Sequence, residues 1–294
     1  GWYYFTASVP AYDRIELRRA RTIAALAEAQ TVDVWRKPDT GPFSELIWAP
    51  EIHHLFGQWV IYFAAAPSRA IKDELFQHRM YAITTSAENP LEGSWTPPVR
   101  VETGIDSFCL DATAFVDRGS IYYVWAQKDP AIRGNSNLYI ARLASPAQLK
   151  TVPVRLSVPE FDWETKGFWV NEGPSVLISH GKVFISYSAS ATDENYCMGL
   201  LYARDDADLL DARSWQKAKE PIFKTCYEHK VYGPGHNSFT VAEDGQTDLL
   251  VYHARTYTEI VGDPLWDPNR HTYVKPLTWN DQGMPVFGRP SCVE

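Results

Sequence analysis

One plan recurs four times along this chain, and a fifth copy begins partway through it. In each copy a short segment with a polar or acidic residue leads to a turn glycine, and a strand rich in aromatic and β-branched residues follows. The copies are Ile47-Trp-Ala-Pro-Glu51 before Gly57, Leu110-Asp-Ala-Thr113 before Gly119, Asn171-Glu-Gly-Pro174 before Gly181, and His236-Asn-Ser-Phe239 before Gly245. Gly1-Trp-Tyr-Tyr-Phe5 repeats the glycine and strand alone, so we expect its leading segment before residue 1.

The residues Trp48, Asp111, Glu172 and His236, called the anchors below, recur at intervals of 61 to 64 residues. This period is longer than the WD40 or kelch repeat and has room for about four strands. Four full copies and one partial copy therefore predict an all-β, five-bladed β-propeller that spans residues 1–294 as one domain. The anchors would then lie on innermost strands, facing one another around the channel.

Local patterns agree with an all-β class. Turn residues bound seven β-rich runs, which are Trp2–Thr6, Trp59–Ala65, Met80–Thr85, Ile121–Trp125, Leu138–Arg142, Val183–Ser188 and Leu249–His253. Three short segments have helical patterns, namely Thr22–Gln30, Ala144–Leu149 and Ala207–Trp215.

Composition narrows the classes of partner. The 294 residues carry a formal net charge of −8 and no basic run, which argues against a nucleic acid or an anionic membrane surface as partner. The longest apolar run, Trp59–Ala66, is far shorter than the roughly 18 residues needed to span a bilayer. We therefore expect a soluble monomer whose ligand is neutral or cationic.

The four cysteines show no Cys-x-x-Cys spacing, and their pairing cannot be derived from the sequence. Cys197 lies in the apolar run Tyr196–Leu201, where a free buried thiol is the preferred interpretation.

Two anchors are acids with apolar neighbours. Burial among such neighbours disfavours the charged form of Glu172, and an ionised Asp111 beside it would act in the same direction, which suits a general acid. Paired carboxylates in a water-accessible pocket are the working parts of glycosidic bond cleavage. The 11 Trp, 16 Tyr and 13 Phe offer faces for sugar stacking, although most must serve strand packing. The alternative is a propeller used only as a binding platform, with the anchors as packed core.

At these residues the chain resembles glycoside hydrolase family 43, a five-bladed propeller family of α-L-arabinofuranosidases, arabinanases and β-xylosidases. The resemblance covers essentially the whole chain and is greatest to the exo-acting α-L-arabinofuranosidase branch. It rests on Tyr12–Arg19, Ile47–His53, Ser107–Thr113, Trp125–Lys128, Asn171–Pro174, Tyr187–Thr192, Tyr232–Ser238 and Asp267–Thr272.

The resemblance implies an inverting mechanism with three carboxylates. Glu172 matches the general acid and Asp111 matches the aspartate that modulates its pKa. The general base belongs to an Asp-Pro segment of the first blade, which we expect before Gly1. Asp13 is the nearest substitute for that base, but it is more plausible as a contact to a sugar hydroxyl or as a solvated turn residue.

Further substrate-binding residues follow from motif and position. Trp48 is expected as a wall of the sugar site, with a core tryptophan as the alternative. Arg270 resembles an arginine that bonds the terminal sugar or the modulating aspartate, with a surface salt bridge as the alternative. Phe5, Gln127 and Ser188 are placed at the pocket rim.

His236 is a candidate ligand of a metal ion in the channel, with a hydrogen-bonded structural histidine as the alternative. No cofactor is required, and a structural ion, calcium or another, is expected at most.

The predicted function is an inverting exo-α-L-arabinofuranosidase, secreted or periplasmic, that acts on arabinose-containing oligo- or polysaccharides such as arabinan. The alternatives are a β-D-xylosidase or bifunctional enzyme, because the two sugars present similar hydroxyls, and a non-catalytic carbohydrate-binding propeller if the base is absent.

Overall fold

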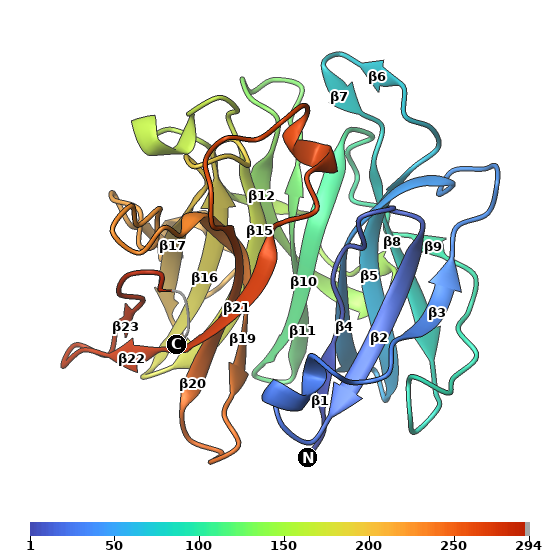
Figure 1. Cartoon of the computed structure of the whole chain (residues 1–294), viewed down its shortest axis with the longest axis horizontal. Helices are drawn as coiled ribbons and strands as arrows, with labels where there is room; N and C mark the ends of the chain where they lie inside the picture. Colours follow the sequence, from blue (N-terminus) through green and yellow to red (C-terminus); the bar gives the residue numbers. More distant parts are fainter. Residues whose placement is uncertain (292–294) are drawn as a thin grey trace. The chain divides into compact units, whose positions relative to one another are not determined.

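The computed structural model describes residues 1–291, and almost all of its regular structure is antiparallel β-sheet (Figure 1). The helical elements of this range are four 3-10 turns, which are η1 (Ala24–Leu26), η2 (Asp162–Glu164), η3 (Ala212–Ser214) and η4 (Pro264–Trp266). No helix among residues 1–291 has the length and apolar character needed to cross a bilayer. The predicted all-β class is confirmed.

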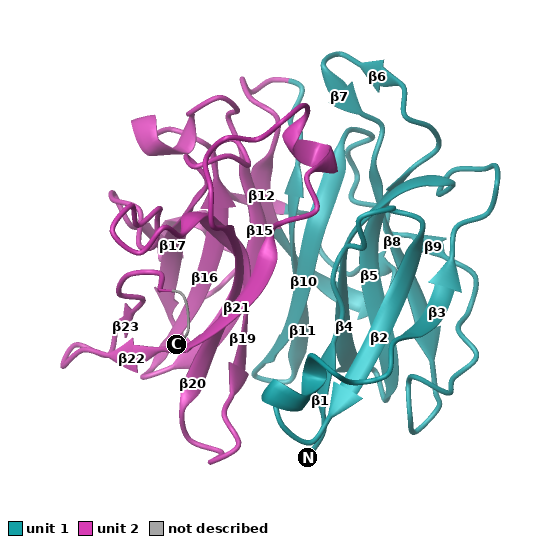
Figure 2. Cartoon of the chain, viewed as in Figure 1, with its two compact units in different colours: residues 1–130, 140–153 teal, residues 131–139, 154–294 magenta. Residues whose placement is uncertain are grey.

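The chain forms two compact units, coloured separately in Figure 2. Unit 1 comprises residues 1–130 and 140–153, and unit 2 comprises residues 131–139 and 154–294. The strands of unit 1 are β1 (Tyr3–Phe5), β2 (Arg14–Ala20), β3 (Val32–Arg36), β4 (Glu45–Leu55), β5 (Gln58–Ala66), β6 (Ile71–Lys72), β7 (Leu75–Phe76), β8 (Arg79–Thr85), β9 (Val99–Arg100), β10 (Cys109–Asp117), β11 (Ser120–Gln127) and β13 (Gln148–Leu149). Strand β12 (Asn137–Ser145) has residues in both units.

The strands of unit 2 are β14 (Val154–Ser157), β15 (Asn171–Ser179), β16 (Lys182–Ala189), β17 (Cys197–Arg204), β18 (Gln216–Lys217), β19 (Tyr232–Val241), β20 (Asp248–Arg255), β21 (His271–Pro276), β22 (Thr278–Trp279) and β23 (Pro285–Val286).

Five sheets follow one another along the chain, with the orders β1-β2-β3, β4-β5-β8-β9, β10-β11-β12-β13, β15-β16-β17-β18 and β19-β20-β21. Two small hairpins, β6-β7 and β22-β23, accompany them. This succession is that of a five-bladed β-propeller, the predicted fold class. Each of the four anchors lies on the first strand of its sheet, namely β4, β10, β15 or β19.

The repeated glycines close the first hairpin of their sheets. The two-residue turns Phe56-Gly57, Arg118-Gly119 and His180-Gly181 have positive φ at both positions, between 45° and 73°. This is the type I′ geometry that matches the twist of a β-hairpin, and glycine adopts it without steric cost. A Cβ at Gly57, Gly119 or Gly181 would meet nothing within 4 Å, so the backbone angle, not lack of space, calls for glycine.

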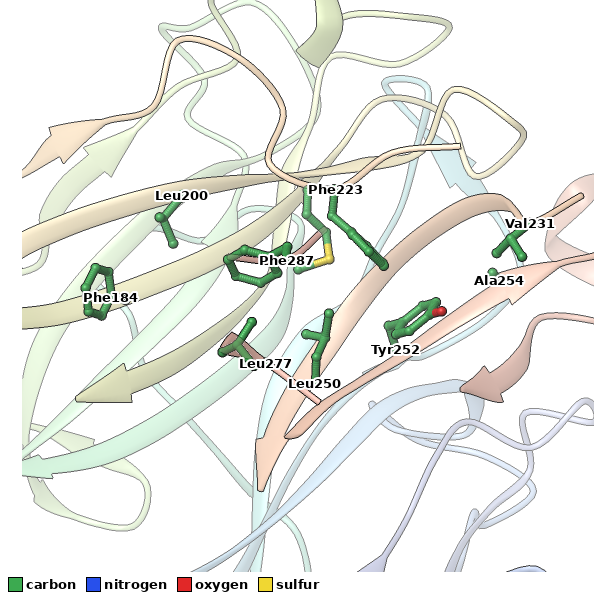
Figure 3. Close-up of a cluster of buried hydrophobic side chains, with 10 residues drawn as sticks. Phe184, Leu200, Phe223, Val231, Leu250, Tyr252, Ala254, Leu277 and Phe287 are labelled. Carbon is green, nitrogen blue, oxygen red and sulfur yellow. The ribbon is translucent and has the colours of Figure 1, made fainter. Parts of the chain in front are cut away.

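Middle strands are buried on both faces, which explains their unbroken apolar runs. Strand β5 is buried from Val60 to Ala66. In unit 1 a core joins β2, β4, β5 and β8 through Ile15, Leu17, Ile47, Ile61, Phe63, Ala65, Tyr81 and Ile83. In unit 2 the core drawn in Figure 3 contains Phe184, Met198, Leu200, Phe223, Val231, Leu250, Tyr252, Ala254, Leu277 and Phe287. Full burial of one such large apolar side chain contributes about 1.5–3 kcal/mol.

The structure corrects the three predicted helical segments and confirms the prediction for Cys197. Ala144–Leu149 is not helical: it holds the end of β12, a turn at Pro146-Ala147 and β13. Thr22–Gln30 and Ala207–Trp215 keep only the short turns η1 and η3. Cys197 is a free buried thiol, as predicted, and burial raises its pKa to about 12. Cys292 lies outside the described residues.

Candidate active site

Every anchor lies where the pairing of its strand is interrupted. The register shifts beside Trp48, Asp111, Glu172 and His236, all on first strands. Asp111 and His236 have positive φ of 49° and 42°, and Gly173, which follows Glu172, has 53°. A β-bulge re-aims the side chain it carries, and left-handed non-glycine residues are retained where the surrounding structure determines them. Ala49, which follows Trp48, has a φ of 46°, so all four bulges contain a left-handed residue at or next to the anchor.

In unit 1, Asp111 on β10 is only 5% exposed. Polar side chains of β10 and of the neighbouring strand β4 contact one another. The Thr113 hydroxyl donates to Glu51 Oε1 at 2.6 Å, and His53 Nε2 lies 3.2 Å from the same oxygen. Two buried hydroxyls, those of Tyr62 and Tyr123, lack a hydrogen-bond partner in the part of the chain that the structure describes. Unit 1 therefore places buried polar groups, beyond the predicted Asp111, on or next to its first strands.

Trp48 has a rigid aromatic base in unit 1. Its ring stacks on the buried His78 imidazole, with centroids 3.8 Å apart and planes at 22°, and the Phe76 ring meets it edge-on at 5.6 Å. His78 Nε2 donates to the Leu46 carbonyl at 2.9 Å. Burial lowers the pKa of His78 to about 3, so its imidazole is neutral near neutral pH. The half-buried indole of Trp48 is therefore held as a flat, fixed surface, as a sugar wall requires.

The neutral His78 makes the stability of the protein sensitive to acid. An unfolded histidine titrates near pH 6.5. Between that pH and about 3 the unfolded chain binds the extra proton, so this group's stabilisation is lost as the pH falls. We expect about 2 kcal/mol less free energy of unfolding at pH 5 than at pH 7 from this group. His78→Gln should remove that difference in urea unfolding followed by tryptophan fluorescence.

The exposed His54 provides the control for this measurement. His54→Gln should keep the wild-type difference between the two pH values. A His78→Gln protein that loses as much stability between pH 7 and pH 5 as the wild type would contradict the assignment.

The remaining candidates of unit 1 differ in their surroundings. The Asp13 carboxylate accepts from Arg14 at 2.7 Å and lies 3.7 Å from Arg36. Phe5 is half-buried on β1. Gln127 is fully buried: its Oε1 accepts from Trp125 Nε1 at 2.8 Å, and its Nε2 donates to the Ile105 carbonyl at 2.6 Å. These bonds give Gln127 a structural role, and we do not carry it into the proposed sugar site.

In unit 2, a buried polar network fixes the start of β15, which carries Glu172. The fully buried Glu164 carboxylate accepts from Asn171 Nδ2, the Tyr187 hydroxyl and Lys217 Nζ, each at 2.9 Å. The Asn171 side-chain oxygen in turn accepts from a serine hydroxyl at 2.7 Å. Because Asn171 precedes Glu172 directly, this network holds the backbone from which the candidate acid projects.

The Glu172 side chain has a tyrosine partner. The Tyr196 hydroxyl donates to Glu172 Oε1 at 2.8 Å. Tyr196 is not among the site residues predicted from the sequence, because it lies in the apolar run that contains Cys197.

Ser188 and His236 come together in unit 2. The fully buried Ser188 hydroxyl accepts from the backbone N–H of His236 at 2.7 Å, which fixes the bulge in β19. Within residues 1–291, no three His, Cys, Asp or Glu side chains gather closely enough to hold a metal ion. The ion at His236 stays a prediction, and no step below depends on it.

Arg270 closes a well-anchored loop of unit 2. Arg255, 3% exposed, pairs with Asp267 at 3.3 Å, and Asp267 also accepts from the Tyr257 hydroxyl at 2.6 Å. Burial lowers the pKa of Arg255, and the nearby positive charge of Arg270 lowers it further. Burial, followed by the charge of Arg270, also holds the pKa of His253 well below its ordinary value. Arg270 therefore lies near enough to β20 for its charge to act on both Arg255 and His253.

Comparison with known proteins decides the family. The model of Glycosyl hydrolases family 43 matches residues 1–285. The chain belongs to this family. The resemblance inferred from the motifs is thus confirmed.

Similar proteins narrow the comparison. An extracellular exo-α-(1→5)-L-arabinofuranosidase of Streptomyces avermitilis is 51% identical over 99% of this chain. α-L-Arabinofuranosidase 43 of Humicola insolens is 50% identical over the same share. The family 43 chain spans 60% of the length of each of these relatives. The crystal structure of α-L-arabinofuranosidase from Lactobacillus brevis has a TM-score of 0.97 and 58% identity, covering 99% of this chain and 91% of its own.

The predicted site residues of this family 43 chain are thus divided between its units. Trp48, Asp111, Asp13, Phe5 and Gln127 lie in unit 1. Glu172, Ser188, His236 and Arg270 lie in unit 2. The meeting of Asp111 and Glu172 at one pocket stays a prediction.

Proposed function

We propose that this chain is the catalytic domain of an inverting exo-α-L-arabinofuranosidase that releases terminal L-arabinofuranose from arabinan or arabino-oligosaccharides. The observation that carries the proposal is that similar proteins have the same name. Proteins 51% and 47% identical to the chain, from two Streptomyces species, are both named extracellular exo-α-(1→5)-L-arabinofuranosidases. An extracellular site of action follows as part of the proposal.

Glu172 is proposed as the general acid. In this role its carboxyl proton passes to the glycosidic oxygen as the bond to the anomeric carbon breaks, so that the leaving sugar departs as a neutral alcohol. The bulge and the Asn171–Glu164 network support the role, because a general acid needs a fixed orientation. Asp111 is proposed as the modulator, whose negative charge keeps the acid protonated at working pH.

Trp48 and Arg270 are proposed to bind the terminal sugar. The fixed indole of Trp48 provides a flat face for the apolar side of a sugar ring. Arg270 offers several N–H donors to hydroxyl oxygens, and the ion pair of Arg255 and Asp267 anchors the loop that ends at Arg270. Ser188 supports this site through the backbone of His236 instead of through a sugar contact.

The water-activating base is proposed to belong to the Asp-Pro segment that the family resemblance implies, and not to Asp13. The Asp13 carboxylate is already bonded to Arg14 and lies close to Arg36. Arginine donors thus already occupy the oxygens of Asp13, whereas a general base needs a free oxygen directed at the attacking water.

The proposal is tested on the full-length protein with the 4-nitrophenyl glycosides of α-L-arabinofuranose and β-D-xylopyranose. We expect kcat/KM to be at least about tenfold higher on the arabinoside, which corresponds to about 1.4 kcal/mol of transition-state discrimination. Proton NMR of the first product should show the β-anomer, because inversion of an α-linkage yields it.

Three results would change the assignment. Comparable rates on the two glycosides would favour the bifunctional alternative, and a preference for the xyloside would favour the β-D-xylosidase. Binding of arabinan without release of sugar would favour the non-catalytic alternative.

A further inference from the structure

Tyr196 donates a hydrogen bond to the carboxyl group of Glu172. The phenol oxygen lies 2.8 Å from Glu172 Oε1. The ring is 1% exposed and comes from the segment between β16 and β17, so it approaches the carboxyl group from a different element than β15. A hydroxyl can donate to a carboxylate and accept from a carboxylic acid, so this partner serves Glu172 in both protonation states.

The Tyr196 ring has little freedom to move. It stacks on the His253 imidazole with centroids 5.6 Å apart and planes at 10°. On β19, a Cβ added to Gly235 would lie 2.4 Å from Tyr196 Cε1, so the ring packs directly on a glycine backbone. The backbone N–H of Tyr196 donates to the Asp193 carbonyl at 3.2 Å. A hydrogen bond from such a fixed ring restricts the orientation of the acid.

Three other ionisable residues of unit 2, His236, His253 and Arg270, lie near this pair or near one another. His236 lies against Gly173, since a Cβ there would be 3.0 Å from its Cγ, and its ring is 6.5 Å from that of His253. Arg270 acts on His253 through its charge. Burial keeps the His253 imidazole neutral, so the ring that Tyr196 stacks on adds no charge of its own. The Tyr196 hydroxyl thus offers a direct hydrogen bond through which the fold can adjust Glu172.

We propose that Tyr196 is a positioning residue for Glu172, which fixes the orientation of the acid and sets the upper pH limit of its activity. This inference rests on the proposed function. A phenol that donates to a carboxylate stabilises the ionised form, and activity that needs the protonated acid ends as that form appears. Tyr196 therefore fixes the orientation of Glu172 and also lowers the pH at which activity is lost on the alkaline side.

The test is the pH profile of kcat/KM for Tyr196→Phe in the full-length protein on an arabino-oligosaccharide. The substitution keeps the ring that stacks on His253 and removes only the hydroxyl. A hydrogen bond to a charged group is worth about 1.5–3 kcal/mol, so the alkaline limb should move up by about one pH unit or more. At the optimum, kcat should fall about tenfold while KM changes less than threefold.

Tyr187→Phe is the matched control. Its hydroxyl also donates to a buried glutamate at 2.9 Å, but this glutamate is Glu164, which supports the backbone of Glu172 through Asn171 and is not the proposed proton donor. The control should lose stability and keep the alkaline limb in place. The proposal is overturned if the limb of Tyr196→Phe coincides with that of the wild type or of the control.

A second variant and a second readout keep the two proposals separable. Replacing Tyr196 by 3,5-difluorotyrosine strengthens the donor and should move the limb to lower pH, which covers the case in which Tyr196→Phe does not fold. If the wild type releases no sugar, the proposed function fails. Carbon-13 NMR titration of the Glu172 carboxyl group then tests the role of Tyr196. That role is refuted if the titration midpoint is the same in the wild type and in Tyr196→Phe.

Discussion

Glu172→Gln is expected to lower kcat on arabino-oligosaccharides by a factor of about 10² to 10⁴, the usual contribution of a general acid. Glutamine keeps the shape of the side chain and an oxygen that can accept from Tyr196, but it has no proton to give to the leaving sugar. The loss should be far smaller on an arabinoside with a dinitrophenolate leaving group, because that group departs without protonation. Steady-state kinetics on the two substrates measures both effects.

The control for this prediction is Glu220→Gln, an exposed glutamate of the same unit. It should match the wild type on both substrates. Thermal unfolding should separate Glu172→Gln from the wild type by little, since the substitution is isosteric. If Glu172→Gln retained more than a tenth of the activity on the oligosaccharide, or lost equal factors on both substrates, another residue would be the acid.

The repeat carried most of the fold prediction. Turn glycines such as Gly57 and Gly181 report a backbone angle that other residues adopt only with strain, so their spacing reveals hairpins directly. Trp48 and Glu172 followed from the same spacing, because one residue per repeat lies on the first strand. Local pattern failed at Ala144–Leu149, where sheet pairing outweighs helix propensity. Pro146 was the available signal, because proline favours the second position of a β-turn.

The surroundings of the candidate acid were less predictable. Tyr196 and Glu164 reach the neighbourhood of Glu172 through tertiary packing, and no spacing in the sequence brings them there. Gly235 did carry a signal, since a glycine inside a strand pattern indicates close approach of another group. Gln127 shows what a strand-end position leaves open: the amide is fully buried and bonds within unit 1, and its place at the pocket rim stays a prediction.

The second large expected effect is a loss of stability when the buried Arg255–Asp267 ion pair is broken. Asp267→Asn removes the negative charge that faces Arg255, and both side chains are almost fully buried, at 9% and 3% exposure. A buried charge left without its partner costs about 3–5 kcal/mol, so we expect the free energy of unfolding to fall by about that amount. The variant should also raise KM for arabinosides, because the Asp267 carboxylate accepts from Tyr257 and from the Asn269 backbone and so shapes the loop that ends at Arg270.

The pH dependence gives an independent check on this ion pair. Burial alone would raise the pKa of Asp267, but hydrogen bonds from Tyr257 and the Asn269 backbone, with the charge of Arg255, hold it below its ordinary value. The stabilisation by ionised Asp267 is therefore complete above the ordinary aspartate pKa and is lost as the pH falls through the lowered pKa. Asp267→Asn should abolish that part of the acid dependence of the unfolding free energy.

Asp263→Asn, in the same loop, is the control: this exposed carboxylate accepts only from the Leu265 backbone among the bonds described, so its loss should cost less than about 1 kcal/mol. Equal unfolding free energies for the two variants in urea would show that the buried pair does not hold the Arg270 loop.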